Sequence, residues 1–362
     1  MVGSGQIIKF PVGGLKIKVK RLRMRFRVFA TAAAVASVTG AMVDVFVADE
    51  TVACPRIPAI VGTSNGTLLA FAEGRRDSCS DGSAKSLIMS RSVDNGKSWT
   101  APTVLVGNAT AVIGNPMPVF DAHTNQVLVQ FITSTGSAVG NGNWQIASTD
   151  DGLTWTEPVD LSPFFGEFVG IMPGPGNAIQ LKSGRLLFAG HYGPYQFDLS
   201  WWSDDYGATY NISAEKLEQM DEIALVELSD GRVMTNIRNQ HLDACDCRAV
   251  ALSSDGGETW GDIYYDPQLP SPVCQASIVS INNTLYFSNP ASTGARVNIT
   301  VRKSLDDGTT WDDGVLIWEN VGPGYSCLVG GGIQSSPPQG GILFERYTDD
   351  GTDAISFATY DL

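Results

Sequence analysis

Three arginines at the ends of strand-like segments are the residues that most suggest chemistry. Arg56 lies between two prolines in "CPRIPAI", Arg238 ends "DGRVMTNIR" and Arg296 lies near the start of "GARVNITVR". A lone arginine at a strand end is usually solvated or part of a surface ion pair. Three guanidinium groups that converge would instead bind a carboxylate through charge-assisted, bidentate hydrogen bonds. The sequence therefore predicts a carboxylate site if the fold brings these three segments together.

Other candidate side chains stand near the same segments. Arg75 follows "FAEG", Glu222 lies at the opposite end of a predicted hairpin from Arg238, and Tyr325 stands in the glycine-rich "GPGYSCLVGGG". Metal chemistry has less support, because the six cysteines lack CxxC spacing and the chain has only three histidines. We therefore predict no zinc site, and no metal or organic cofactor.

A five-fold repeat indicates the elements that must position these residues. Strand-like runs such as "SLIMSR" and "AVALSS" precede boxes of eight residues, which read "SVDNGKSW", "STDDGLTW", "SDDYGATY", "SSDGGETW" and "SLDDGTTW". In each box the aspartate can accept backbone N–H bonds, the glycine can take a positive φ, and the terminal aromatic ring can pack into the sheet. We call these segments Asp boxes and expect them to have a scaffold role and no catalytic one.

The spacing of the Asp boxes predicts an all-β, six-bladed β-propeller. Their shared aspartates are 56, 55, 50 and 51 residues apart, at Asp94, Asp150, Asp205, Asp255 and Asp306. Such a period fits blades of four strands, and residues 50–362 have room for six of them. One blade must then lack a box, and we expect that blade to be assembled from the two chain ends. Strand ends from different blades meet near the axis of a propeller, where the arginines could converge.

The first 49 residues are predicted to be an N-terminal signal peptide or signal anchor. A basic stretch, "KIKVKRLRMRFR", precedes about sixteen uncharged residues, which is short for a full membrane span. Cleavage after Ala41 or Ala48 is possible, and an organelle transit peptide is the alternative. Five N-x-S/T sequons and six cysteines fit the secretory pathway. We expect the protein to be secreted, lysosomal or membrane-anchored.

The charge distribution excludes some partner classes. The chain has a formal charge of −14, and residues 1–49 hold eight Lys/Arg against two Asp, so the remainder carries −20. A body that acidic is a poor candidate for binding nucleic acids or anionic membranes through its overall charge. We therefore predict no nucleic-acid partner, and we expect any membrane anchoring to come from the N-terminal segment.

The region from about residue 50 to 362 resembles exo-α-sialidases (neuraminidases) of the bacterial and animal type. "PRIPAI" is similar to the family's first-arginine motif, the Asp boxes are its structural repeat, and the motifs follow the family's order over nearly the whole region. The resemblance implies a propeller catalytic domain over 50–362 and an arginine triad of Arg56, Arg238 and Arg296. The departures are mild: there is no evident lectin insert, and Tyr210 replaces tryptophan in the third box.

The same resemblance implies the catalytic residues. It assigns the role of acid/base catalyst to Asp81, with Asp77 as the rival because "RRDSCSDG" permits a small shift of the alignment. Glu222 and Tyr325 match the family's glutamate and tyrosine pair.

Two further residues match supporting positions of the family. Arg75 corresponds to an arginine that borders the site, and Glu345, in "LFER", to a late glutamate that orients the first arginine. Cys54 and Cys79 each stand two residues before a motif residue, so a bridge between them is conceivable. The pair "CDC" at Cys245 and Cys247 should have separate partners.

The chemistry of a sialic acid agrees with these roles. Its anomeric carbon carries a carboxylate, which arginines bind and which would repel an anionic carboxylate nucleophile. A tyrosine of ordinary pKa, near 10, is neutral at rest and can attack as its proton moves to a glutamate. Sialidases with a tyrosine nucleophile are the exception to the two-carboxylate scheme of glycosidases. The resemblance thus implies a retaining exo-α-sialidase that hydrolyses terminal sialic acids of glycoproteins, glycolipids or oligosaccharides through a tyrosine-linked intermediate.

Two alternatives remain open from the sequence. A trans-sialidase, or a hydrolase of a related 2-keto sugar acid such as KDN, would share the same active-site residues. A non-catalytic propeller that binds glycans or proteins would have no reason to keep the whole residue set in order.

Overall fold

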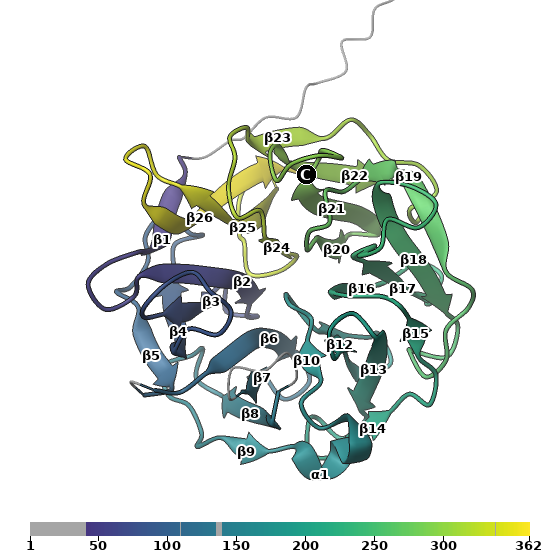
Figure 1. Cartoon of the computed structure of the whole chain (residues 1–362), viewed down its shortest axis with the longest axis horizontal. Coiled ribbons are helices and arrows are strands. Elements are labelled where there is room, and N and C mark those ends of the chain that lie inside the picture. Colours follow the sequence, from purple (N-terminus) through teal and green to yellow (C-terminus); the bar gives the residue numbers. More distant parts are fainter. Residues whose placement is uncertain (1–40, 109, 135–139, 337) are drawn as a thin grey trace, which may run out of the picture. The chain divides into compact units, whose positions relative to one another are not determined.

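The computed structural model describes residues 41–362 except 109, 135–139 and 337, so the predicted leader lies largely outside the described residues. Six antiparallel sheets are arranged as blades around a central axis (Figure 1). Five of them have four strands, and the remaining one has two additional short strands. The prediction of an all-β, six-bladed propeller is confirmed. Within the described ranges, no helix is both long and apolar enough to cross a membrane.

Three blades are formed by the first half of the propeller, and their strands are given in chain order. The first blade contains β2 (Cys54–Gly62), β3 (Leu68–Arg75), β4 (Lys85–Ser92) and β5 (Thr103–Val106). The second contains β6 (Ile113–Asp121), β7 (Gln126–Thr133), β8 (Gly142–Ser148) and β9 (Val159–Asp160). The short helices α1 (Ser162–Phe165) and η1 (Gly166–Phe168) follow it. The third contains β10 (Met172–Pro173), β11 (Ile179–Gln180), β12 (Leu186–Tyr192), β13 (Phe197–Ser203), β14 (Asn211–Ile212) and β15 (Leu217–Glu218).

The other three blades complete the ring. The fourth contains β16 (Ile223–Glu227), β17 (Val233–Ile237), β18 (Cys247–Ser253) and β19 (Tyr264–Pro270). The fifth contains β20 (Ser277–Ile281), β21 (Thr284–Pro290), β22 (Ile299–Ser304) and β23 (Val315–Trp318). The sixth contains β24 (Ser326–Val329), β25 (Gln339–Tyr347), β26 (Asp353–Asp361) and, as its outer strand, β1 (Val43–Val47).

The sixth blade joins the two ends of the propeller, as expected. β1 pairs antiparallel with β26, with Val43 opposite Phe357 and Val47 opposite Ala354. The predicted domain boundary at residue 50 is therefore wrong, because the outer strand of this blade begins at Val43. Cleavage of a leader after Ala48 would remove β1, whereas cleavage after Ala41 would keep it.

The position of the closure explains the missing Asp box. In each of the other blades a box connects the third strand, counted from the axis, to the outermost strand, as in the segment between β4 and β5. In the sixth blade these two strands are β26 and β1, which are separate ends of the chain. No chain segment connects β26 to β1, so the sixth blade has no place for an Asp box.

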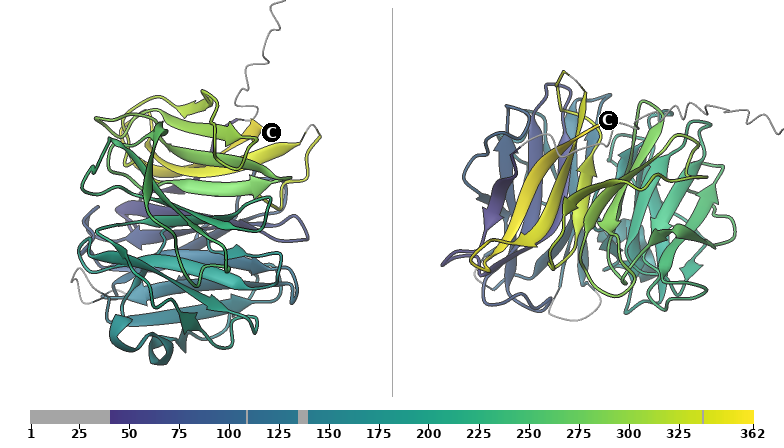
Figure 2. Two further views of the ribbon diagram at one scale, coloured as in Figure 1. Left: turned by 90° about the vertical axis from the view of Figure 1, so that its right-hand side faces the viewer. Right: turned by 90° about the horizontal axis from the view of Figure 1, so that it is seen from above.

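The propeller has two faces, and Figure 2 shows it from the side. The innermost strands start near one face and end near the other. Arg56, near the start of β2, lines a cavity at one face, and Gly62, at its end, lines a cavity at the other. The third strands run parallel to the innermost ones, so the Asp boxes that follow them lie at the second face, which we call the box face. By the same pairing β26 ends, and β1 begins, at the box face.

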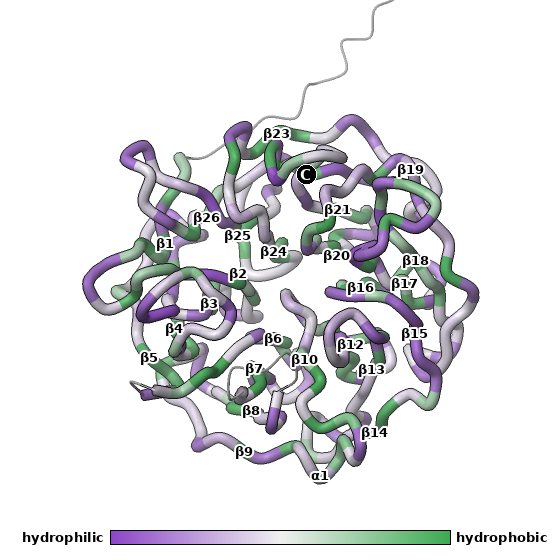
Figure 3. The backbone as a smooth tube through the Cα atoms, in the orientation of Figure 1, coloured by the Kyte–Doolittle hydropathy of each residue, from purple (hydrophilic) through white to green (hydrophobic). Residues whose placement is uncertain are grey.

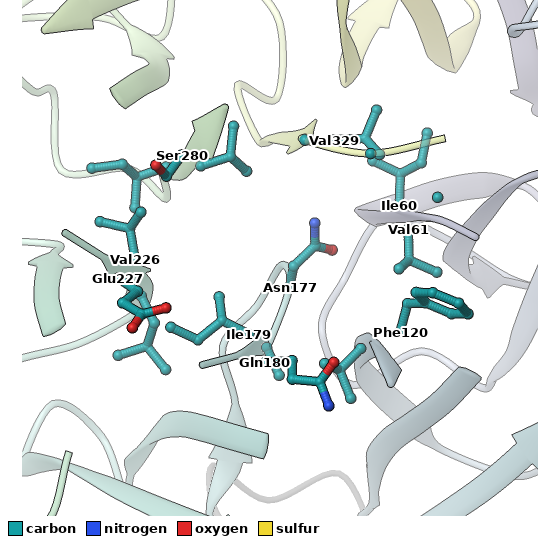
Figure 4. Close-up of a pocket in the computed structure, with 18 of the residues that line it drawn as sticks. Ile60, Val61, Phe120, Asn177, Ile179, Gln180, Val226, Glu227, Ser280 and Val329 are labelled. Atoms are coloured by element: carbon teal, nitrogen blue, oxygen red, sulfur yellow. The ribbon is translucent and has the colours of Figure 1, made fainter. Parts of the chain in front are cut away.

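The cavity at the box face lies on the axis and has a volume of about 460 Å³. Innermost strands of all six blades line it, with apolar side chains such as Ile60, Val226 and Val329 around Asn177 (Figure 4). None of the residues predicted for the functional site is among its lining residues.

Each Asp box is a turn closed by its own side chains. In the first box the N–H of Ser98 donates to Asp94 Oδ1 at 2.9 Å, and the N–H of Gly96 donates to Ser92 Oγ at 2.9 Å. Gly96 has a φ of +78°, which glycine adopts without steric cost. The other four boxes repeat this pattern with a positive-φ glycine at the same place.

The boxes also connect neighbouring blades. The ring of Trp99, from the first box, packs edge-on against Phe357 of the sixth blade, with 5.5 Å between the ring centroids. Tyr210, which replaces tryptophan in the third box, donates its hydroxyl to Gln145 of the second blade. The hydrophobic core follows the same plan, because six apolar clusters each join residues of two adjacent blades. Hydrophobic residues occur in every blade (Figure 3). The scaffold role expected for the boxes fits these contacts.

Candidate active site

The face opposite the box face, which we call the site face, holds a cavity of about 480 Å³ with walls from all six blades. It brings together all the residues that were predicted to contact a substrate. These are Arg56, Arg75, Asp81, Glu222, Arg238, Arg296 and Tyr325. The eighth predicted residue, Glu345, is buried behind them.

Tyr325, Glu222 and Arg238 form a hydrogen-bonded group in this cavity. The hydroxyl of Tyr325 donates to Glu222 Oε1, and Arg238 Nη1 donates to Glu222 Oε2 at 2.8 Å and to Tyr325 Oη at 3.3 Å. Burial, followed by the negative charge of Glu222, raises the pKa of Tyr325 well above its usual value near 10. The phenol is therefore neutral at rest and is bound to a carboxylate that can accept its proton.

Glu345 connects the first arginine to the tyrosine. Its Oε1 accepts from Arg56 Nε at 2.6 Å and from the N–H of Ile57 at 2.9 Å, and its Oε2 accepts from the N–H of Tyr325 at 3.0 Å. β2 has a bulge between Arg56 and Ala59, where Ile57 takes a φ of +61°. A β-branched residue rarely adopts this conformation, and bulges often redirect a side chain beside a functional site. The bulge directs the Arg56 side chain and the Ile57 amide to the same carboxylate.

Two guanidinium groups lie over the ring of Tyr325. Arg56 and Arg296 are 5.1 Å and 5.5 Å from its centroid, within the range of cation–π contacts. Gly324 permits this packing: its φ is +95°, and a Cβ at this position would lie 3.0 Å from the Cβ of Arg296. The glycine before Tyr325 therefore has a packing reason as well as a conformational one.

Arg296 differs from the other two members of the predicted triad. Arg56 is paired with Glu345, and Arg238 with Glu222 and Asp221. Arg296 donates to the backbone carbonyls of Pro323 and Val273, at 2.9 and 3.2 Å, and no carboxylate of the described chain forms an ion pair with it. Its positive charge is thus left for an anionic ligand in the cavity.

Arg75 and Asp81 form the wall of the cavity in the first blade. The Arg75 side chain is 1% exposed and its Nη2 lies 2.7 Å from Glu73 Oε2 and 2.8 Å from Asp81 Oδ1. The Asp81 side chain itself is 91% exposed. Its rival Asp77 does not line the cavity, and its N–H donates to Ser83 Oγ. The structure therefore favours Asp81 for contact with a ligand.

The sequence did not reveal a buried cluster of charged residues next to Arg75. Lys85 Nζ lies 2.9 Å from Glu73 Oε2, and the N–H of Asn115 donates to Glu73 Oε1 at 3.0 Å. Burial alone would raise the pKa of Glu73, but the charges of Lys85 and Arg75 outweigh it and lower this pKa to about 2. Glu73 is therefore a permanent anion that fixes both cations.

Asp221 and His191 were missed as well. Asp221 Oδ2 lies 3.1 Å from Arg238 Nε, and Asp221 Oδ1 lies 3.8 Å from His191 Nε2. Burial and the charge of Glu222 raise the pKa of Asp221. The adjacency of Asp221 to Glu222 in "MDEIAL" was a usable signal, whereas nothing in the sequence distinguished His191 from the other two histidines.

The six cysteines comprise two bonded pairs and two free thiols. Cys54 and Cys79 form a disulfide, which had been considered conceivable. The sulfur atoms of Cys245 and Cys247 lie within bonding distance of each other, so the expectation of separate partners is wrong. Cys274 and Cys327 are free and buried.

Comparison with known proteins gives consistent matches. Residues 66–331 match the family model described as a BNR repeat-like domain. A curated sialidase from Micromonospora viridifaciens is 34% identical over 347 residues, which cover 85% of this chain and 51% of that protein. An exo-alpha-sialidase from Arthroderma benhamiae is 30% identical over 290 residues, covering 69% of this chain and 67% of the relative. The chain thus spans about half the length of the bacterial relative and two thirds of the fungal one.

Solved structures give the same picture of the fold. The Hadza microbial sialidase Hz136 superposes with a TM-score of 0.73 at 26% identity, over 85% of this chain and 66% of the other. The intramolecular trans-sialidase from Ruminococcus gnavus superposes with a TM-score of 0.75 at 17% identity, over 89% and 99% of the two chains. At that identity the second likeness concerns the propeller alone.

Proposed function

Because this chain belongs to the sialidase family, we propose that it is a retaining exo-α-sialidase that removes terminal sialic acids through a covalent intermediate on Tyr325. The observation that carries the proposal is the group of Tyr325, Glu222 and Arg238, set in a cavity with three further arginines. A buried neutral phenol bound to a carboxylate suits attack on a carbon whose own carboxylate substituent would repel an anionic nucleophile.

Substrate binding would use the charged half of the cavity. The sugar carboxylate would receive hydrogen bonds from Arg56, Arg238 and Arg296. Because Arg296 has no carboxylate partner in the described chain, it gains most from the incoming anion. The remaining ring substituents would face the uncharged wall of the second and third blades, formed by Val112, Ile132, Met172, Pro194 and Tyr195.

The reaction would proceed in two balanced steps. In the first, Tyr325 Oη bonds to the anomeric carbon and passes its proton to Glu222, while Asp81 protonates the departing oxygen. In the second, water gives a proton to Asp81 and attacks the same carbon, and Tyr325 leaves and recovers its proton from Glu222. Two displacements retain the anomeric configuration. Each residue ends in its starting protonation state, so the cycle needs no cofactor.

The test of the proposed function is incubation with a fluorogenic α-sialoside and with the matching KDN derivative, with NMR detection of the first product. We expect hydrolysis of the sialoside and first release of the α anomer. Release of the β anomer first would contradict a retaining mechanism. Faster cleavage of the KDN derivative, or a transferred or anhydro product, would replace hydrolysis of sialic acids by one of the related activities. Binding of the glycoside without turnover would support a non-catalytic propeller.

The two candidate acids can be separated by leaving-group dependence. Asp81→Ala should lower kcat/KM for sialosides of alkyl alcohols by about a hundredfold or more, and for 4-nitrophenyl sialoside far less, because nitrophenolate leaves without protonation. Asp77→Ala is the matched control and should change both rates by less than about threefold. Steady-state kinetics with the two substrate classes measure the difference. If the two variants exchange phenotypes, Asp77 is the acid.

The substrates and location follow from the same proposal. Terminal sialic acids of glycoproteins, glycolipids or oligosaccharides would be the substrates. A secretory route is supported by the Cys54–Cys79 disulfide, since disulfides persist in oxidising compartments. It is also supported by four exposed sequon asparagines, Asn65, Asn108, Asn211 and Asn282.

A further inference from the structure

The connection between β3 and β4 carries Asp81, and we call its residues 76–84 the acid loop. The loop is closed on itself, since the N–H of Arg76 donates to the carbonyl of Ala84 at 2.9 Å and the N–H of Ser83 to that of Ser80 at 3.0 Å. Its catalytic candidate is 91% exposed at the side chain. Packing therefore contributes little to the position of the Asp81 carboxyl group.

Three links join the acid loop to the rest of the site. Arg75 donates to the carbonyl oxygen of Cys79 and forms an ion pair with Asp81. The third link is the disulfide between Cys79 and Cys54 at the start of β2. Cys79 stands two residues before Asp81, and Cys54 stands two residues before Arg56. One covalent bridge thus connects the backbone that carries the acid to the backbone that carries the first arginine.

The ion pair between Arg75 and Asp81 is lost in the first step, when Asp81 must be protonated to act as the acid. A general acid must be protonated to act, and a neutral carboxyl group no longer forms an ion pair with a guanidinium. The disulfide and the backbone bond to Cys79 do not depend on the proton of Asp81. A short exposed loop with one of these two links removed samples more conformations, and a displacement of about 1 Å can cost about a hundredfold in rate.

We propose that the Cys54–Cys79 disulfide positions Asp81 for proton transfer, so that cleavage of bonds to poor leaving groups depends on the oxidised bridge. The inference rests on the proposed sialidase function and deepens it. Cys54 and Cys79 act through Asp81 and do not touch the substrate in this view. A protein kept reduced would keep its propeller and its arginine cluster, and it would lose mainly the contribution of the acid.

The experiment compares the double variant Cys54→Ala/Cys79→Ala with the wild type on two substrates. In sialyl-lactose the leaving group is a hydroxyl oxygen of lactose, which needs a proton. In α-sialosyl fluoride the leaving group is fluoride, which has little need of one. We expect kcat/KM for sialyl-lactose to fall at least about tenfold, and that for the fluoride to change less than about threefold. The ratio of the two values is the readout, because loss of folded protein lowers both equally.

Reduction of the folded wild type with dithiothreitol, below its melting temperature, provides a second measurement if the variant folds poorly. It should reproduce the same change in the ratio, and dithiothreitol should leave the ratio of the double variant unchanged. In an Asp81→Ala background, removal of the bridge should leave the ratio unchanged, because the acid that it positions is absent.

Three results would overturn the proposal. An equal fall on both substrates would give the bridge a structural role only. Unchanged values of kcat/KM on both substrates would show that the backbone bond from Arg75 suffices. A further change of the ratio in the Asp81→Ala background would mean that the bridge acts through another residue. A wild type that cleaves neither substrate would instead refute the proposed function, and the inference with it.

Discussion

Tyr325→Phe is expected to lower kcat on natural sialosides by about a thousandfold or more, because it removes the oxygen that attacks the anomeric carbon in the proposed mechanism. The ring keeps its contacts with Arg56 and Arg296, so the cavity keeps its shape and KM should change much less than kcat. Burst-phase and steady-state kinetics on a sialoside with a good leaving group measure both quantities.

The same residue should carry a covalent label. A 3-fluoro sialosyl fluoride reacts in the first step, and its ring fluorine slows the second by destabilising the oxocarbenium-like transition state. Peptide mapping of the treated wild type should place the added mass on the fragment that contains "GPGYSCLVGGG". Tyr325→Phe should give no adduct. A label on Glu222 would contradict the tyrosine mechanism even if the protein were a sialidase.

The matched control for this variant is Tyr360→Phe. Tyr360 belongs to β26 in the sixth blade, is 1% exposed, and its hydroxyl has no hydrogen-bond partner in the described chain. Removal of that hydroxyl should leave kcat within about twofold of the wild type, because a buried oxygen without a partner contributes little. A large loss of kcat in Tyr360→Phe would indicate that removal of a tyrosine hydroxyl disturbs the propeller in general. The loss in Tyr325→Phe would then be no evidence for a tyrosine nucleophile.

Arg296→Ala should have the second largest effect, a fall in kcat/KM of about a hundred- to a thousandfold. This corresponds to about 3–4 kcal/mol, the scale of charge-assisted hydrogen bonds lost from a partly desolvated site. Arg296 is the clearest member of the triad to test, because it has no ion-pair partner in the described chain that its removal would leave unpaired. Arg296→Lys should not restore the rate, since lysine lacks the planar fork.

Arg302→Ala is the control for Arg296→Ala. Arg302 lies on β22, six residues further along the same segment, and it does not line the cavity. Its removal should leave KM within about twofold of the wild-type value. Near wild-type activity in Arg296→Ala, together with a large loss in Arg302→Ala, would transfer the third carboxylate contact to Arg302.

The sequence predicted the propeller well because its signal is repeated. Five boxes at nearly equal spacing define the blade length, and each box contains the chemical groups that make its turn. The site residues were predicted by order and motif, as for Arg56 in "PRIPAI" and Tyr325 in "GPGY". Their convergence follows from the propeller. Each candidate stands near the start of a strand that leaves the site face or near the end of a strand that reaches it, so the candidates lie at the same face.

The residues that the sequence missed depend on contacts between distant segments. Lys85 begins β4 and looks like any surface lysine until β3 brings Glu73 beside it. His191 becomes informative only through its approach to Asp221. The boundary at residue 50 was wrong for a different reason. The apolar run of the leader continues into the apolar residues of β1, so no change of composition marks the point where the propeller begins.

The strand closure at β1 and β26 has a consequence for attachment of the propeller to a support. Val43 and Asp361 both lie at the end of the sixth blade that belongs to the box face. A support joined directly before Val43 or after Leu362, whether a bilayer, a resin or a carrier protein, would be attached at the box face of the propeller. The mouth of the cavity at the site face would then point outward, toward glycans in free solution or on an opposing surface, and away from glycans beside the propeller on its own support.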